Sequence, residues 1–193
     1  MSRRRILGLV FVLLILTAAP LRAQETQRFV RFEVDGRTSY GLLQGEEIQV
    51  IRGNLFGEHR VTSARVELSD VRLLAPVDPS KVIAVGLNYQ SHLGARAPAE
   101  YPGLFAKYPT SLVGPDGEIV RPSDSRNLHY EGEMVIVMGR TAKNVPVAEA
   151  GDYIFGVTAG NDISERDWQG ADLQWFRAKG SDTFGPVGPV VVT

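Results

Sequence analysis

With 193 residues, of which 21 are basic and 22 acidic, the chain is long enough for one well-cored domain and a small second unit. Its formal net charge of −1, with both signs interspersed, excludes the basic surface that typical nucleic-acid-binding proteins carry. The sequence contains no cysteine, which excludes disulfides, thiolate nucleophiles and thiolate metal ligands.

Residues 1–23 have the pattern of a secretory signal peptide. Arg3, Arg4 and Arg5 precede an almost purely apolar run at residues 6–19, and a plausible cleavage site ends at Ala23. The apolar run is shorter than the roughly 20 residues of a transmembrane helix. We therefore expect a periplasmic or secreted protein, cut after Ala23, that does not contact the membrane after cleavage. Export by the general or the twin-arginine route stays open.

Residues 24–78 predict a small N-terminal β domain. Apolar and polar residues alternate over residues 29–34, directly before Asp35-Gly36, which is a strong hairpin-turn signal. Further short strands are expected at residues 40–43 and 47–51. The proline-rich segment 75–79 marks the expected domain boundary. Nothing in this unit suggests chemistry.

Residues 79–193 predict a second unit that is also mainly β, so the chain as a whole falls into the mainly β (α+β) class. Apolar runs predict strands at residues 81–86, 131–138, 152–158 and 185–193. Residues 93–105 are rich in alanine, glycine and proline, which indicates a loop or lid. Ser164, followed by Asp167, resembles a capping box and predicts the start of a helix.

Acidic side chains mark the ends of two predicted strands. Glu131 and Glu133 are two residues apart and therefore share one face of a strand that is apolar on both faces, which predicts burial on both sides. Asp162 follows the next strand. Three carboxylates would form an all-oxygen site suited to Mg²⁺, Mn²⁺ or Ca²⁺ rather than to zinc. The alternative is an exposed strand end with solvated glutamates.

Other polar residues nearby permit two interpretations each. Arg166 and Gln169 lie three apart on the predicted helix, where the arginine could bind a substrate carboxylate or form a surface ion pair with Asp162 or Asp167. Lys179 could be a solvated turn residue or a cation directed at developing negative charge. His92 could be a general base or simply a turn residue.

Short segments in the second unit, in this order, resemble the motifs of the fumarylacetoacetate hydrolase family. They are residues 85–92, 104–107, 111–114, 129–133, 161–167 and 179–186. The resemblance covers residues 70–193 and implies a mixed β-sandwich roll, usually dimeric, preceded by a small β domain. Members usually continue further along the chain, so we expect residues 79–193 to be a C-terminally incomplete catalytic domain.

The resemblance also implies roles for individual residues. Mg²⁺ or Mn²⁺ would be bound by Glu131, Glu133 and Asp162. His92 would activate water, and Lys179 would assist catalysis. The residues implied in substrate binding are Tyr89, Lys107 near the lid, Arg166 and Gln169. The substrates of the family are small 2-oxo or 1,3-dicarbonyl acids.

The implied activity is hydrolysis of a carbon–carbon bond in acylpyruvate-like or fumarylacetoacetate-like acids. One departure weakens it: some members carry a glutamate three residues after the histidine, where this chain has Ala95. Without an orienting carboxylate an imidazole loses its fixed tautomer, although Glu100 could replace it from the loop. Two alternatives therefore stay open, an isomerase or decarboxylase of 2-hydroxymuconate-type diacids and a non-catalytic remnant.

Overall fold

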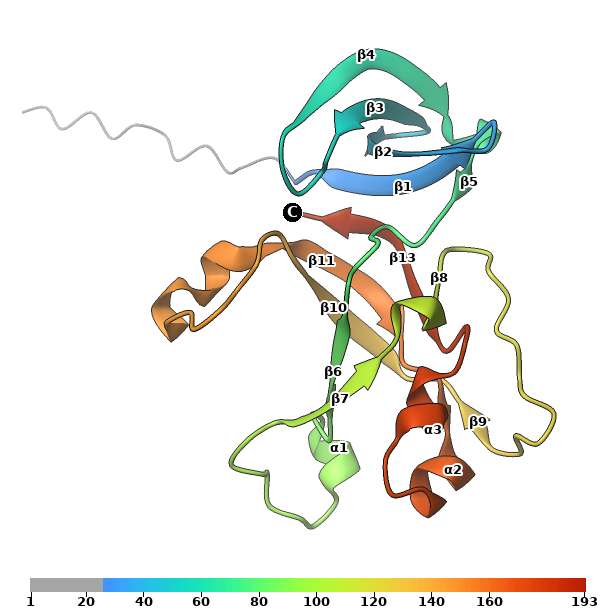
Figure 1. The fold of residues 1–193 in the computed structure, drawn as a ribbon, viewed down its shortest axis with the longest axis vertical. Helices are drawn as coiled ribbons and strands as arrows, with labels where there is room; N and C mark the ends of the chain where they lie inside the picture. The colour runs from blue at the N-terminus through green and yellow to red at the C-terminus, as the bar shows by residue number, and fades with distance from the viewer. Residues whose placement is uncertain (1–25) are drawn as a thin grey trace, which may run out of the picture.

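The computed structural model describes residues 26–193, so the predicted signal peptide and its cleavage point lie outside the described residues. The described chain is built mainly from strands with a few short helices, which confirms the predicted mainly β class. Figure 1 shows an upper group of strands, β1 to β4, above a lower group that carries all of the α-helices.

The upper group is an antiparallel meander of β1 (Arg28–Val34), β2 (Arg37–Gln44), β3 (Glu47–Gly53) and β4 (His59–Glu67). Asp35 and Gly36 connect β1 to β2 with φ of 50° and 71°, as a two-residue hairpin turn requires, which confirms the predicted hairpin. The strand β4 was not predicted, because its residues lack an apolar alternation.

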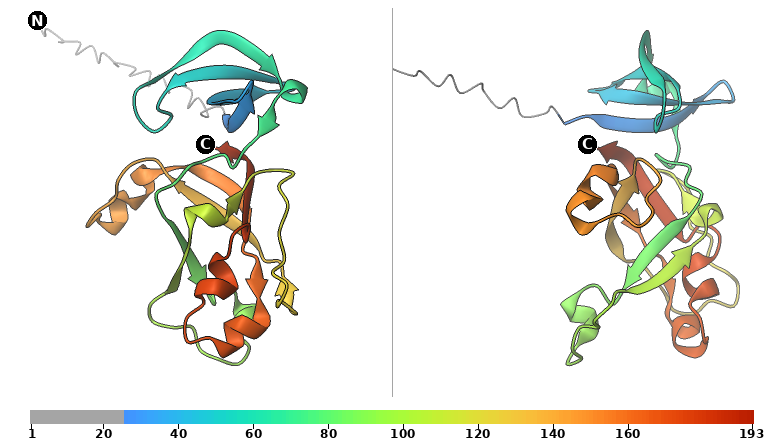
Figure 2. Two further views of the ribbon diagram at one scale, coloured as in Figure 1. Left: turned by 45° about the vertical axis from the view of Figure 1, so that its right-hand side comes forward. Right: turned by 60° about the vertical axis from the view of Figure 1, so that its left-hand side comes forward.

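One strand joins the two groups into a single sheet. The sheet has nine strands. Seven of them follow one another in the order β10-β11-β13-β1-β2-β3-β4, and two further short strands pair with β1 and β13. The strand β13 (Gly185–Val192) pairs with β1 through Arg28↔Val192 and Phe29↔Val191. In Figures 1 and 2, β13 rises from the lower group toward β1. One core cluster contains residues from both groups, including Phe29, Leu42, Val137 and Val191.

The strands β10 (Gly132–Met138) and β11 (Ile154–Asn161) form an antiparallel pair at one end of this sheet. The expectation that this strand is buried on both faces is wrong for the described chain. Val137 is buried, but Met134 is 68% exposed, and Ile136 and Met138 are each 49% exposed. The reason is that Met134, Ile136 and Met138 share one face of the strand, and no described element buries that face.

The remaining elements are short, and most of them surround the lower half of the sheet, while β5 (Arg72–Leu73) pairs with β1 in the upper group. β6 (Val82–Gly86) and β7 (Gly103–Lys107) form a separate hairpin, with α1 (Gln90–Leu93) in the loop between them. The others are β5 (Arg72–Leu73), β8 (Leu112–Val113), β9 (Leu128–His129), β12 (Ser164–Glu165), α2 (Arg166–Ala171), α3 (Phe176–Gly180) and 3₁₀ turns at Leu68–Asp70, Pro109–Ser111 and Val147–Tyr153. Within residues 26–193, no helix is long and apolar enough to cross a membrane.

Candidate functional site

A cavity of about 270 Å³ opens between the β6–β7 hairpin and the segments that follow β11. Its lining comes from β6, the turn before α1, α1 itself, β7, the start of β10, the end of β11, and α2 and α3. The predicted site residues on its wall are Tyr89, His92, Glu131, Glu133, Asp162, Arg166, Gln169 and Lys179. All of the predicted site residues except Lys107 therefore line one cavity.

The register of β10 and β11 places Glu131 and Asp162 side by side. Gly132 pairs with Asn161 in this antiparallel pair. Glu131, one residue before Gly132, therefore lies opposite Asp162, one residue after Asn161. The Asp162 amide donates to the carbonyl oxygen of Glu131 at 2.8 Å, and the Glu131 amide donates to the side-chain oxygen of Asn161 at 2.9 Å. These hydrogen bonds hold the backbones of the two acidic residues next to each other.

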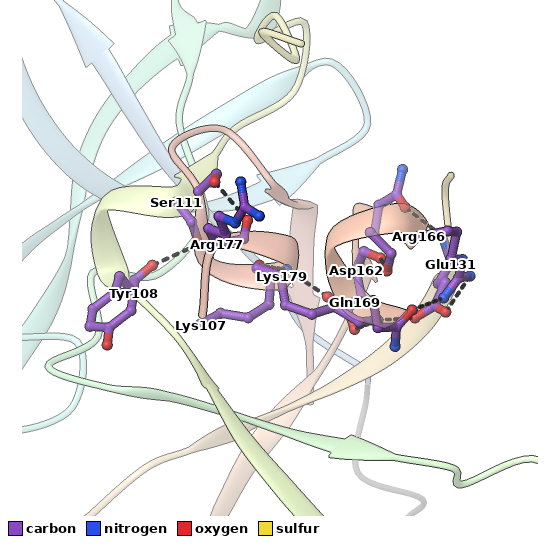
Figure 3. Close-up of polar contacts among 12 residues, drawn as sticks. Lys107, Tyr108, Ser111, Glu131, Asp162, Arg166, Gln169, Arg177 and Lys179 are labelled. Carbon is purple, nitrogen blue, oxygen red and sulfur yellow. Dashed lines mark hydrogen bonds and ion pairs between the residues drawn. The ribbon is translucent and has the colours of Figure 1, made fainter. Parts of the chain in front are cut away.

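The Lys179 ammonium bridges the carboxylates of Glu131 and Asp162. Its Nζ donates to Oε2 of Glu131 and to Oδ2 of Asp162, each at 2.7 Å (Figure 3). The lysine side chain is only 3% exposed, so its charge depends on these two carboxylates for compensation. Lys179 extends from α3, where Ala178 and Gly180 are buried beside it. The interpretation of Lys179 as a solvated turn residue is therefore wrong.

Lys107 approaches Asp162 from outside the cavity. Its Nζ lies 2.5 Å from Oδ1 of Asp162 and also donates to the backbone carbonyl of Lys179. Burial lowers the pKa of the Lys107 ammonium, and the charge of Asp162 and the hydrogen bond to it partly restore that pKa. The described structure gives Lys107 no contact with the cavity; it positions Asp162 and α3.

Arg166 supports Glu131 from α2. One guanidinium nitrogen donates to Oε1 of Glu131 at 2.6 Å and another to the side-chain oxygen of Gln169 at 2.8 Å (Figure 3). The arginine therefore pairs with Glu131, and neither of the ion pairs that the sequence suggested, with Asp162 or Asp167, forms. Burial raises the pKa of Glu131, but the hydrogen bonds and charges of Lys179 and Arg166 outweigh it and hold that pKa at about 2.

Glu133 has a different environment. Its carboxylate accepts a long hydrogen bond of 3.4 Å from the hydroxyl of Tyr89. Burial raises the pKa of Glu133, and the negative charges of Glu131 and Asp162 raise it further. Among the three carboxylates, this is the one that no lysine or arginine of the described chain contacts.

The residue types of this wall fit a hard divalent cation. Three carboxylates line one cavity, and oxygen donors of this kind are the ligands that Mg²⁺ and Mn²⁺ prefer. In residues 26–193 no three histidine or acidic side chains are arranged around one metal position, and the Lys179 ammonium donates to both Glu131 and Asp162. The residues that would hold a metal are therefore Glu131, Glu133 and Asp162.

His92 lies on another part of the cavity wall. It belongs to the last turn of α1, and its ring lies edge-on to Tyr89 with 6.3 Å between the centroids. Ala95 offers no carboxylate to orient the ring. Glu100, the candidate replacement, is exposed and does not line the cavity.

The sequence interpretation missed the apolar part of the cavity. Phe105 from β7 and Trp175, directly before α3, both line it, and their rings meet at 5.4 Å between centroids. A signal for Trp175 did exist, because it lies four residues before Lys179 and side chains at that spacing share a helix face. Phe105 carried no such signal.

Comparison with known proteins identifies the chain's relatives. Residues 81–193 match the model of the fumarylacetoacetate hydrolase C-terminal domain, and residues 27–76 match that of the Rv2993c-like N-terminal domain. Protein Rv2993c of Mycobacterium tuberculosis is 50% identical over 141 residues, covering 72% of this chain and 53% of its own length. Oxaloacetate tautomerase Fahd2a, a mitochondrial protein of Rattus norvegicus, is 42% identical over 130 residues, covering 65% and 41%.

A solved structure is also similar to this chain. That of 5-carboxymethyl-2-hydroxymuconate delta-isomerase from Mycobacterium smegmatis superposes with a TM-score of 0.79 at 44% identity, covering 86% of this chain and 66% of that one. The chain spans about half the length of the curated relatives it matches.

A further buried carboxylate fixes the helix that carries Arg166 and Gln169. Glu165 is fully buried and accepts from the backbone amides of Asn127, at 2.7 Å, and Trp168, at 3.1 Å. It is the N-cap of α2, so the predicted cap at Ser164 is wrong by one residue. Ser164 instead donates to the carbonyl of Asp162.

Replacing Glu165 by alanine should lower the free energy of unfolding by about 1–3 kcal/mol, because the buried amide of Trp168 and the partly buried amide of Asn127 lose their acceptor. Glu165→Gln retains one acceptor oxygen and should cost clearly less. Urea unfolding followed by circular dichroism measures both, with Glu149→Ala, at an exposed site, as a control expected to stay within about 0.5 kcal/mol. Equal stability of Glu165→Ala and the wild type would contradict this role.

Proposed function

The chain belongs to the fumarylacetoacetate hydrolase family, and we propose that it is a divalent-metal-dependent enzyme acting on small 2-oxo or 1,3-dicarbonyl acids. The observation that carries the proposal is the cavity wall on which three carboxylates stand beside Lys179 and Arg166. Such a wall can bind a metal and an anionic substrate together, because acidic and basic groups alternate along it.

The metal would be Mg²⁺ or Mn²⁺, with Ca²⁺ as a further hard cation that accepts the same oxygen ligands. Bound by Glu131, Glu133 and Asp162, it would supply Lewis acidity toward the substrate carbonyl and stabilise an enolate. The chain's own cations complement this chemistry. The Arg166 guanidinium, held by Gln169, can pair with a substrate carboxylate, and the Lys179 ammonium can stabilise a developing oxyanion.

The first reaction we propose is hydrolysis of an acylpyruvate. His92 accepts a proton from water, and the resulting hydroxide attacks the acyl carbonyl carbon. The bond between that carbon and the neighbouring methylene then breaks. Its electron pair forms the enolate of pyruvate, which takes up a proton. The balance is one acylpyruvate and one water converted to one carboxylic acid and one pyruvate.

A second candidate is isomerisation, tautomerisation or decarboxylation of a diacid of the 2-hydroxymuconate type. Two observations favour it: Ala95 provides no carboxylate to orient His92, and proteins at 42% and 44% identity are an oxaloacetate tautomerase and a 5-carboxymethyl-2-hydroxymuconate delta-isomerase. Proton shuttling between carbon and oxygen needs an enolate but no activated water. Both candidates therefore share the same site.

The metal proposal predicts one Mg²⁺ or Mn²⁺ per chain in isothermal titration calorimetry. Glu133→Gln should weaken that binding by at least about tenfold, because the substitution removes a ligand charge and keeps the shape. Glu149→Gln, at an exposed site outside the cavity, should bind the ions as the wild type does. A wild type that binds neither ion would contradict the proposal.

The two reactions give different products from acetylpyruvate in D₂O with Mg²⁺, followed by NMR. Hydrolysis predicts acetate and pyruvate in equal amounts, and His92→Ala should slow their release by about 10²–10⁴-fold. Proton transfer alone predicts protein-dependent deuterium exchange at the methylene without acetate, relative to a protein-free control. Neither product nor exchange would favour the non-catalytic remnant.

We also propose that the protein is exported and forms a homodimer. Export rests on the signal-peptide pattern of residues 1–23, and the dimer rests on what the family resemblance implies. Protein purified from its native source should begin at Gln24 in N-terminal sequencing and should have twice the single-chain mass in light scattering. A native chain that begins at Met1 would contradict export, and a monomer would contradict the dimer.

A further inference from the structure

Part of the cavity lining is apolar. Val85, Leu87, Phe105 and Trp175 line it there. Val85 and Leu87 are 46% and 45% exposed, so these side chains are not part of a closed core. Leu87 also has a φ of 56°, a left-handed conformation that costs a non-glycine residue energy and that often occurs at functional sites.

The aromatic rings of this side extend from the charged wall. The Nζ of Lys179 lies 5.3 Å from the centroid of Phe105, and the Phe105 ring meets Trp175 at 5.4 Å and 76°. Trp175 packs directly on the backbone of Gly86, where an added Cβ would lie 2.8 Å from its ring. A ligand whose 2-oxo acid group is bound at the charged wall, with one of its oxygens at Lys179, would therefore have its chain directed along Phe105 toward Trp175.

The far end of this path offers no separate cation among the described residues. Among the described residues, the lysine and arginine that line the cavity are Lys179 and Arg166, and both belong to its charged wall. A second carboxylate placed against Phe105 and Trp175 would lose hydration without gaining a partner, which is costly. An alkyl or aryl tail there would instead be removed from water, which is favourable.

We propose that Trp175, supported by Phe105, is a specificity-determining residue that selects 2-oxo monoacids with an apolar tail over 2-oxo diacids. The inference rests on the proposed function, since it assigns the 2-oxo acid group to the charged wall. It goes beyond that function by deciding between the two substrate classes left open above.

Three stable ligands test it by calorimetric titration of the full chain in MgCl₂: pyruvate, 2-oxohexanoate and 2-oxoadipate. The last two have the same length and differ only in a terminal methyl or carboxylate. A fully buried methylene strengthens binding about fourfold, so a partly buried tail of three should make 2-oxohexanoate bind about tenfold tighter than pyruvate. 2-Oxoadipate should bind no tighter than pyruvate.

Variants at two neighbouring aromatic residues locate the effect. Trp175→Ala should bring 2-oxohexanoate to within about twofold of pyruvate. Trp175→Lys should reverse the order, so that 2-oxoadipate binds more tightly than 2-oxohexanoate, a gain that misfolding cannot produce. Phe176→Ala is the matched control, because Phe176 is 63% exposed, packs on Tyr108 and does not line the cavity. It should keep the wild-type order.

The outcomes separate the two proposals. A wild type that binds pyruvate, but binds 2-oxohexanoate no more tightly or 2-oxoadipate most tightly, overturns the inference and leaves the proposed function standing. The inference is also overturned if Trp175→Lys keeps the wild-type order. A wild type that binds none of the three ligands contradicts the proposed function and the inference together.

Discussion

The Lys179 ammonium, 2.7 Å from an oxygen of Glu131 and of Asp162, is the interaction on which the lower half of the molecule depends. Removing one partner from such a buried group leaves an uncompensated charge, so the segments that carry the three residues must stay together. Those segments are the start of β10, the end of β11, and α3. Lys107 adds β7 to the same network through Asp162.

The sheet explains how such distant segments meet. β11 ends directly before Asp162, and β13 begins five residues after Gly180, the last residue of α3, and pairs with β11. Because β13 also pairs with β1, the N-terminal group of strands is tied through backbone hydrogen bonds to the segment that carries Lys179. The two groups therefore share one sheet, and the position of the charged wall depends on both.

The sequence was informative wherever a local rule decides the structure. Asp35-Gly36 predicted its hairpin, and the spacing of Glu131 and Glu133 at one strand end, followed by Asp162, predicted acidic residues that indeed line one cavity. Properties that depend on distant packing were not predictable. Periodicity could not show the exposure of Met134, and the burial of Glu165 as a helix cap depends on Asn127 from another segment.

The helix α3 links the chemistry of the site to its selectivity. Trp175 is the residue directly before this helix, Lys179 lies four residues later, and Phe105 lies between their cavity-facing groups at 5.3 Å and 5.4 Å. A group bound at the ammonium is therefore at a fixed distance from the aromatic side. Two carboxylates hold the ammonium, and the tryptophan ring packs on the backbone of Gly86. Under the proposed function, the tail of a 2-oxo acid bound at the ammonium would therefore lie against Phe105 and Trp175.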